Sequence, residues 1–297
     1  MRQLPRSVLA ALLTVYIVWG STYFAIQIAL KDFPPFLLMA SRFLVAGSLL
    51  FIWNLARGAR LPNAREWRAA TVIGGFMLGG GMGLTAVAQQ YVSSGITAVF
   101  AACSPMILSS LSGLFGDWPK RREWLGIFAG FAGALLLASG GQFAAQPIGI
   151  VILLAAVLCW DIGSVLSQKK FQLAPGGMGF ASEMLMGSLF LAAFSVLNGE
   201  SWPAQISMQA WAAWTYLVVA GSLLAFTAYM YLLSKVSAGL ASSYAYVNPV
   251  IAVALGAGLG GEHLSRNEWL ATLVILVSVV VITSSSSHKK QAEPEAA

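Results

Sequence analysis

Residues 8–30, VLAALLTVYIVWGSTYFAIQIAL, form a run of 23 residues without a charged side chain. A helix needs about 20 mostly apolar residues to cross the hydrocarbon core of a bilayer, so this run predicts a membrane-spanning helix. Arg2 and Arg6 precede it, as in a secretory signal peptide, but the run is too long for one and contains no plausible cleavage site. We therefore expect it to be retained as the first helix.

The composition extends this interpretation to the whole chain. Of the 297 residues, 58% are hydrophobic and 9% are charged, and the mean hydropathy is +0.76. Soluble domains carry about 25% charged residues, so a soluble enzyme, a nucleic-acid binder and a disordered protein are excluded as classes. Cys103 and Cys159 both lie in apolar runs and are expected to pack as small side chains. No metal-ligand spacing is present, and we expect no cofactor and no metal.

Nine further apolar runs follow the first. The backbone of a spanning segment must satisfy its own hydrogen bonds in lipid, and the alternation of a membrane β-barrel is absent, so we predict an all-α fold. Residues 285–297 are expected to form a disordered cytoplasmic tail. The ten predicted spans are 8–30, 36–56, 69–90, 94–115, 123–140, 147–168, 177–197, 209–233, 238–260 and 268–284.

Lysine and arginine are distributed unevenly between the two sides of these spans. With ten spans both termini share one side, and that side carries 14 Lys and Arg residues. The opposite side carries only Lys31 and Arg266, while Arg42 lies inside the second span. Because cytoplasmic loops are enriched in positive charge, we predict that both termini are cytoplasmic.

The two halves of the chain resemble each other. The first repeat is expected over residues 1–145 and the second over residues 146–284. Five spans are an odd number, so the second repeat must enter the membrane inverted, which is typical of carriers with a site between the repeats and alternating access. The clearest matches are Trp19 with Trp160, Pro105 with Pro249, and residues 123–125 with residues 268–270, both EWL.

Pro105 and Pro249 are predicted to lie inside the fourth and ninth spans. A proline there removes a backbone donor and clashes with the carbonyl four residues earlier. Ser104 and Asn248 precede the two prolines and add polar groups beside each kink. The pair fits hinges that line a cavity, and it also fits two purely structural kinks.

Three ionisable residues lie within the spans, at Arg42, Asp161 and Glu183. Charge in the membrane is costly, so each is a candidate functional residue. Arg42 and Glu183 occupy equivalent repeat positions with opposite charge, which favours either an ion pair or separate placement near helix ends. Asp161 is a candidate for proton uptake or for contact with an amine.

Polar and aromatic residues in the spans are candidates to line a cavity. The helical spacing of Ser242, Tyr246 and Pro249 places them on one face, and rings with polar tips suit an amphipathic organic substrate. Trp19 and Trp160 fit either a cavity or the aromatic belt at the membrane interface. In the third span a stripe of glycines, residues 75, 79 and 83, indicates close helix packing.

These features resemble a known family. Residues 19–23 (WGSTY) in the first span and 244–249 (YAYVNP) in the ninth, with the inverted repeat, are similar to the drug/metabolite transporter superfamily, specifically the bacterial EamA-type exporters. The resemblance implies a multi-pass inner-membrane carrier with a central cavity that exports amino acids or other small metabolites, by proton antiport or facilitated diffusion. Mapped onto this sequence, the cavity candidates are Trp19, Ser21, Gln89, Phe100, Ser104, Trp160, Tyr244, Tyr246 and Asn248.

Other function classes fit the sequence less well. An intramembrane enzyme needs a nucleophile or metal constellation at membrane depth, but the only histidines, His263 and His288, lie outside the spans. No selectivity filter or ring of pore charges indicates a channel, and no GxxxxGK[ST] motif indicates an ATP-driven pump. The expected partners are a small-molecule substrate and the lipid bilayer, with no nucleic acid. A monomer is expected because both halves are already fused.

Overall fold

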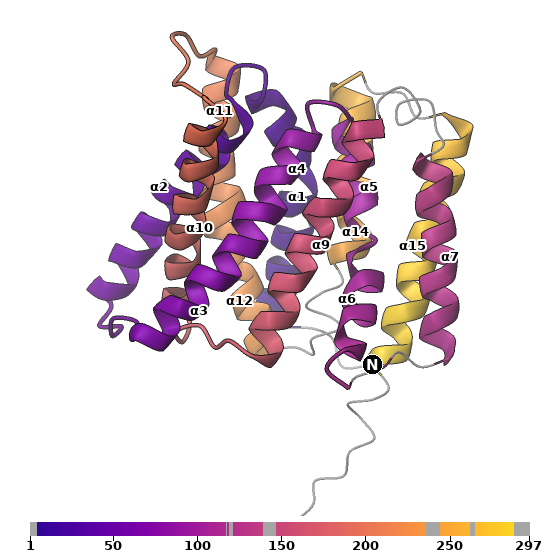
Figure 1. Ribbon diagram of the computed structural model, residues 1–297, viewed down its shortest axis with the longest axis horizontal. Helices are drawn as coiled ribbons and strands as arrows, with labels where there is room; N and C mark the ends of the chain where they lie inside the picture. The colour runs from indigo at the N-terminus through magenta and orange to yellow at the C-terminus, as the bar shows by residue number, and fades with distance from the viewer. Residues whose placement is uncertain are drawn as a thin grey trace, which may run out of the picture.

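The computed structural model describes residues 5–116, 118, 121–138, 147–235, 244–261 and 265–287, and all regular secondary structure in these ranges is helical. The helices form one bundle (Figure 1). Each predicted span overlaps a helix or a series of helices, so the predicted fold class is confirmed. In chain order they are α1 (Arg6–Ala29), α2 (Pro35–Ala56), α3 (Ala64–Gly74), η1 (Gly75–Met82), α4 (Gly83–Ala88), α5 (Ser94–Ala101), α6 (Ser104–Gly113), α7 (Arg121–Ala138), α9 (Pro147–Lys169), α10 (Gly177–Leu197), α11 (Met208–Tyr216), η2 (Leu217–Leu224), α12 (Ala225–Lys235), α14 (Tyr244–Leu259) and α15 (Arg266–Ser287).

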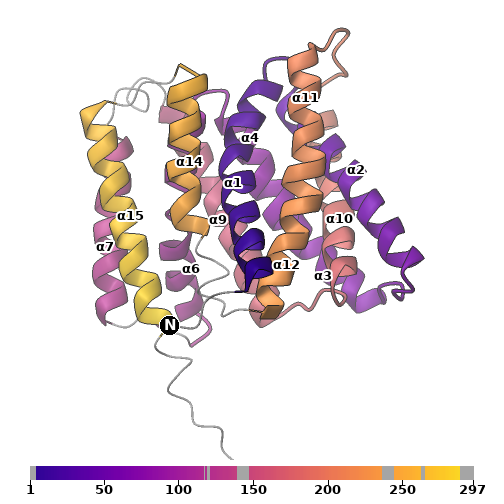
Figure 2. The same ribbon diagram turned by 180° about the vertical axis from the view of Figure 1, so that it is seen from behind.

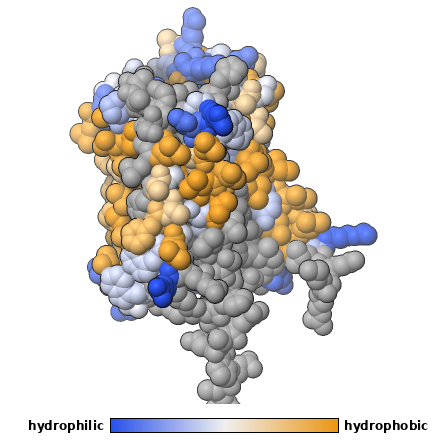
Figure 3. Space-filling view, turned by 90° about the vertical axis from the view of Figure 1, so that its right-hand side faces the viewer, coloured by the Kyte–Doolittle hydropathy of each residue, from blue (hydrophilic) through white to orange (hydrophobic). Residues whose placement is uncertain are grey.

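The outer surface matches a bilayer. Large apolar side chains such as Ile52, Val196 and Leu273 are exposed, and apolar surface forms a broad band between two more polar ends (Figure 3). Among the described residues, six helical segments are long and apolar enough to cross a membrane, and shorter apolar helices lie in the fourth, ninth and tenth spans. The six are Arg6–Ala29, Pro35–Ala56, Ala64–Ala88, Pro147–Lys169, Gly177–Leu197 and Met208–Tyr229.

The first and last helices place the ends of the chain together. Helix α1 begins and α15 ends at the same end of the bundle (Figures 1 and 2), as an even number of crossings requires. The cytoplasmic assignment of that end stays a prediction. Helix α15 continues to Ser287, three residues beyond the predicted span, and the predicted disordered tail from residue 288 onward lies outside the described residues.

The third and eighth spans share an unusual feature. Each is an α-helix interrupted by eight residues of π-helix, η1 in the third span and η2 in the eighth, whose first residues are 142 positions apart. This separation agrees with the spacing of the sequence repeat. π-Helical turns are rare and occur frequently at functional sites. The matched pair is structural support for the duplication.

Contacts between the halves also occur in equivalent pairs. The second span packs on the seventh through α2 and α10, and the fifth packs on the tenth through α7 and α15. Helix α1 packs on α14 and on the eighth span, and α9 correspondingly packs on α6 and on the third span. A pseudo-two-fold relation between the halves therefore runs through the whole bundle.

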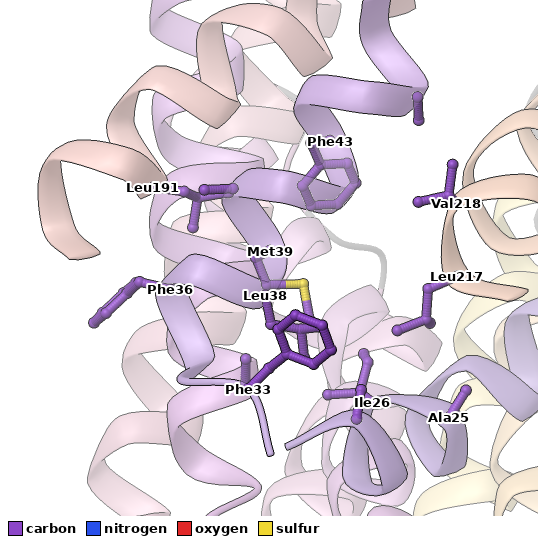
Figure 4. Close-up of a cluster of buried hydrophobic side chains, with 14 of the residues drawn as sticks. Ala25, Ile26, Phe33, Phe36, Leu38, Met39, Phe43, Leu191, Leu217 and Val218 are labelled. Carbon is purple, nitrogen blue, oxygen red and sulfur yellow. The ribbon is translucent and has the colours of Figure 1, made fainter. Parts of the chain in front are cut away.

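Close packing supports this arrangement. In one buried apolar cluster, side chains of α1 and α2 such as Ile26 and Phe43 meet Leu191 of α10 and Leu217 of η2 (Figure 4). Lipid tails are as apolar as these side chains, so the stabilisation comes mainly from van der Waals contact. The glycine stripe of the third span faces α10, since a Cβ at position 75 or 79 would lie 3.0 Å from Phe190. The predicted role of the glycine stripe in close helix packing fits its position against α10.

Loops of the two halves meet at the end of the bundle opposite the chain termini. Glu200 accepts hydrogen bonds from the amides of Phe36 and Leu37, at 3.2 and 2.8 Å, in the first turn of α2. Asp32 accepts one from the Ser207 amide, the N-cap residue of α11, at 2.8 Å. Hydrogen bonds from Ser207 hold the pKa of Asp32 below its ordinary value. Each loop thus caps a helix of the other half.

Candidate functional site

An aromatic cluster joins the two halves near the middle of α1. The Trp19 ring centroid lies 4.8 Å from Tyr244, 5.2 Å from Tyr229 and 5.3 Å from Phe226. The Trp19 Nε1 also donates a hydrogen bond to the Gly221 carbonyl in η2 at 3.1 Å. We call Trp19, Phe226, Tyr229 and Tyr244 the aromatic cluster. It unites the predicted residues Trp19 and Tyr244 with two residues that were not predicted.

A buried carboxylate forms a second feature. Asp161 of α9 has no exposed surface, and its Oδ1 accepts a hydrogen bond from the Ser104 hydroxyl at the start of α6. Among the described residues its Oδ2 has no hydrogen-bond partner. An unsatisfied buried oxygen is unfavourable, and more so in a membrane. The structure therefore brings the predicted Asp161 and Ser104 together and leaves one acceptor open.

The fourth span is interrupted beside this carboxylate. Helix α5 ends at Ala101 and α6 begins at Ser104, so Pro105 is the second residue of a new helix. The predicted mid-helix position is therefore wrong for Pro105, whose place in a first turn is one where a missing amide N–H breaks no intrahelical bond. Pro249 does lie inside α14, as predicted. The hinge role of either proline stays a prediction.

Gln89 directly follows α4 as its C-cap residue, and one atom of its side-chain amide has a hydrogen-bond partner while the other has none. Its Nε2 donates to the Tyr23 carbonyl at 3.1 Å, while its buried Oε1 has no partner among the described residues. The hydrogen bond to Tyr23 fixes the direction of the amide. Gln89 therefore offers a second buried acceptor, on the third span.

Two other predicted residues are engaged in joining helices. With its amide nitrogen toward the carbonyls of Tyr16 and Tyr244, Asn248 donates at 3.2 Å to each and links α14 to α1. The Ser21 and Tyr216 hydroxyls are hydrogen-bonded at 2.6 Å and link α1 to α11. Both side chains therefore have partners within the bundle.

Three predicted cavity residues remain. Two of them pack elsewhere in the bundle, and the side chain of the third lies outside the described residues. Phe100 is buried in an apolar cluster around α5 and α6. Trp160 is partly buried against the third span, since a Cβ at Gly81 would lie 3.2 Å from its own Cβ. The side chain of Tyr246 lies outside the described residues, although its backbone belongs to α14.

Arg42 and Glu183 are both buried but are not paired. Arg42 of α2 donates from Nε to the Ser222 hydroxyl of η2 at 3.0 Å, and its guanidinium carbon lies 4.8 Å from the Phe43 ring centroid. Glu183 lies on the neighbouring helix α10 and is 5% exposed. Within the part of the chain that the structure describes, the one ion pair joins Arg60 and Glu66. Of the two alternatives for Arg42 and Glu183, the ion pair is therefore not formed.

Sequence reasoning missed Phe226, Tyr229, Gly221 and Ser222. All four lie in the eighth span, in which no candidate residue was predicted. Tyr229 was detectable as a tyrosine inside an apolar run. No sequence pattern distinguished Gly221 and Ser222, because their roles depend on hydrogen bonds from Trp19 of α1 and Arg42 of α2.

The possible metal ligands in the part of the chain that the structure describes include two cysteines. Cys103 and Cys159 are both free thiols, as expected, and the Cys159 sulfur packs where a Cβ on Gly80 would lie 2.8 Å from it. Among the described residues no three His, Cys, Asp or Glu side chains lie close enough to hold a metal ion.

Comparison with known proteins identifies the family. Residues 6–139 and 147–284 both match the sequence model of the EamA-like transporter family. The chain belongs to the EamA-like transporter family. Each matched segment lies within one of the two predicted repeats. As a member of this family the chain is a membrane transporter, a family role that argues against an enzyme.

Similar proteins support the same assignment. The chain is 44% identical over 274 residues to the "Uncharacterized inner membrane transporter YedA" of Escherichia coli K12, covering 92% of this chain and 89% of YedA. It is 26% identical to "Protein PecM" of Dickeya dadantii, covering 93% of each. A solved crystal structure aligns with a TM-score of 0.65 at 20% identity, covering 95% of this chain and 99% of that one, and shows the same fold. These relatives support an inner-membrane, multi-pass location.

Proposed function

We propose that this EamA-like transporter exports small amphipathic metabolites, with amino acids as the first class to test, by alternating access as a monomer. The observation that carries the proposal is the aromatic cluster at the contact between the halves, with Trp19 from the first repeat and three residues from the second. Apolar ring faces with polar tips suit a molecule with an apolar body and polar groups.

The two open acceptors support a substrate that carries hydrogen-bond donors. Asp161 Oδ2 and Gln89 Oε1 are buried without partners among the described residues. An ammonium group supplies three donors and a positive charge, which suits a carboxylate such as Asp161. Because the two lie on spans of different repeats, rocking of the repeats changes their relative position.

Flux measurements test this proposal. Purified protein in proteoliposomes loaded with single radiolabelled amino acids should show efflux above empty liposomes for at least one of them. Trp19→Ala should lower that flux about tenfold, equivalent to about 1.4 kcal/mol, from the lost ring contacts. Trp269→Ala, on an exposed residue of α15, is the matched control and should leave flux unchanged. Absence of flux for every solute in a broad small-molecule library overturns the proposal.

Proton coupling is a second candidate, favoured by the open oxygen of Asp161. Flux of a transported amino acid should then depend on pH in the wild type, and Asp161→Asn should remove that dependence while keeping the side-chain size. Glu183→Gln tests the second carboxyl group that is buried within the described spans in the same way. If both variants keep the wild-type pH profile, transport is not coupled to protons through these groups.

A further inference from the structure

The guanidinium of Arg42 is a buried cation without a buried counter-ion among the described residues. Its side chain is only 3% exposed. The one ion pair within the described ranges involves other residues. An isolated charge inside a bilayer is strongly unfavourable unless something compensates it, so such a residue is a functional candidate by default.

The local contacts of Arg42 use only part of its hydrogen-bonding capacity. A guanidinium has five N–H donors. Nε donates to the Ser222 hydroxyl at 3.0 Å, and Nη1 faces only the Met39 sulfur at 3.9 Å, which is a weak acceptor. Ser222 is itself held by donation to the Leu217 carbonyl at 3.0 Å. The group is thus fixed through Nε while its terminal nitrogens lack strong acceptors among the described residues.

Gly221 contacts both the guanidinium and the aromatic cluster. A Cβ at Gly221 would lie 3.1 Å from Nη2 of Arg42 and 3.1 Å from Thr22 Cγ2, so the glycine backbone packs closely against the guanidinium. The carbonyl of the same glycine accepts the Trp19 indole hydrogen bond. The cation and the cluster therefore contact a single residue of η2.

We propose that Arg42 is the receptor for a carboxylate group of the substrate, whose apolar body lies against the aromatic cluster. A carboxylate matches the planar pair of terminal guanidinium nitrogens in charge and geometry. This inference rests on the proposed function and narrows its substrate class to organic acids, including amino acids. A purely structural Arg42, stabilised by Ser222 and the Phe43 ring, is the alternative.

Binding of matched ligands to the purified full chain in detergent tests the inference. The probes are 3-phenylpropionate and its uncharged amide, 3-phenylpropanamide, measured by ligand-induced thermal shift and by titration. Wild type should bind the acid about tenfold more tightly than the amide. Arg42→Gln should abolish that preference, and Arg42→Lys should retain part of it because the charge stays but the planar pair of donors is lost. Arg65→Gln, at an exposed arginine, is the control and should keep the wild-type preference.

A second variant keeps the test valid if Arg42→Gln does not fold. Gly221→Ala leaves the charge in place but puts a methyl group 3.1 Å from Nη2, too close for the guanidinium to keep its position. It should weaken binding of the acid more than binding of the amide. Equal binding of acid and amide by wild type overturns the inference, as does an equal loss for both ligands in folded Arg42→Gln.

Failure of this inference is separable from failure of the proposed function. Flux of phenethylamine or of a neutral solute through the wild type, without an acid preference, leaves the transport proposal standing and refutes the role of Arg42. Preferential binding of the acid that depends on Arg42, without flux of any solute, supports the binding site and refutes the proposed transport.

Discussion

Gly74 lies at the tightest point between the third and seventh spans, and replacing it with alanine should separate them. An added Cβ would lie 2.6 Å from the Glu183 carbonyl oxygen and 2.9 Å from the Gly187 nitrogen, both backbone atoms that cannot rotate away. Ordinary contact begins near 3.4 Å, so α3 and α10 must move apart by about 0.8 Å. Overpacking of this kind costs about 1–3 kcal/mol.

Gly258 is the matched control, because a Cβ there meets nothing within 4 Å. Each substitution also gains up to about 1 kcal/mol of helix propensity, so the difference between the two variants approximates the clash alone. Thermal unfolding of both proteins in the same detergent should show Gly74→Ala melting several degrees below wild type and Gly258→Ala at or slightly above it. Equal melting temperatures for the two variants would refute the close contact between α3 and α10.

Three further predictions concern capped helix ends and use the same unfolding assay. Glu200→Gln keeps the shape of the cap on α2 but removes its charge, and should cost about 1 kcal/mol; an unchanged melting temperature contradicts this. Because Ser207 lowers the pKa of Asp32, this carboxylate stabilises the fold above the ordinary aspartate pKa, and the stabilisation is lost as pH falls through the lowered value. Asp32→Asn should therefore be less stable than wild type at neutral pH, and the gap should close in acid; a gap independent of pH opposes the assignment. Asn63→Ala removes the capping box that Asn63 forms with Glu66 at the start of α3 and should cost about 1 kcal/mol, whereas Asn63→Asp should be tolerated.

Hydropathy was sufficient to predict the helical spans because the bilayer imposes one length and one polarity on each. The charge-free run at 8–30 corresponds to α1 at Arg6–Ala29, within two residues at either end. The repeat was also detectable, because the matches of Trp19 with Trp160 and of Pro105 with Pro249 preserve order and spacing. Both predictions depend on properties of single segments, which a sequence displays directly.

The details of the site depend on contacts between segments, which the sequence does not display. The π-helical stretches GFMLGGGM and LVVAGSLL share no pattern that distinguishes them from ordinary spans. Arg42 and Glu183 are equivalent by repeat position, but residues related by a pseudo-two-fold axis meet only when they lie on that axis. Aligning the two halves of the sequence therefore shows which residues are equivalent, but it does not show which residues lie close together in the fold.

The two π-helices share a backbone conformation but differ in the contacts that their residues make. In η1, Gly80 packs against the Cys159 side chain and contributes only close contact. In η2, Ser222 accepts a hydrogen bond from Arg42, and the carbonyl of the neighbouring Gly221 accepts one from Trp19. In the proposed transport by alternating access, two related halves would give two states of similar energy. Recognition of an asymmetric solute would use unlike side chains in the two halves, and the polar contacts of η2 beside the close packing of η1 are such a difference.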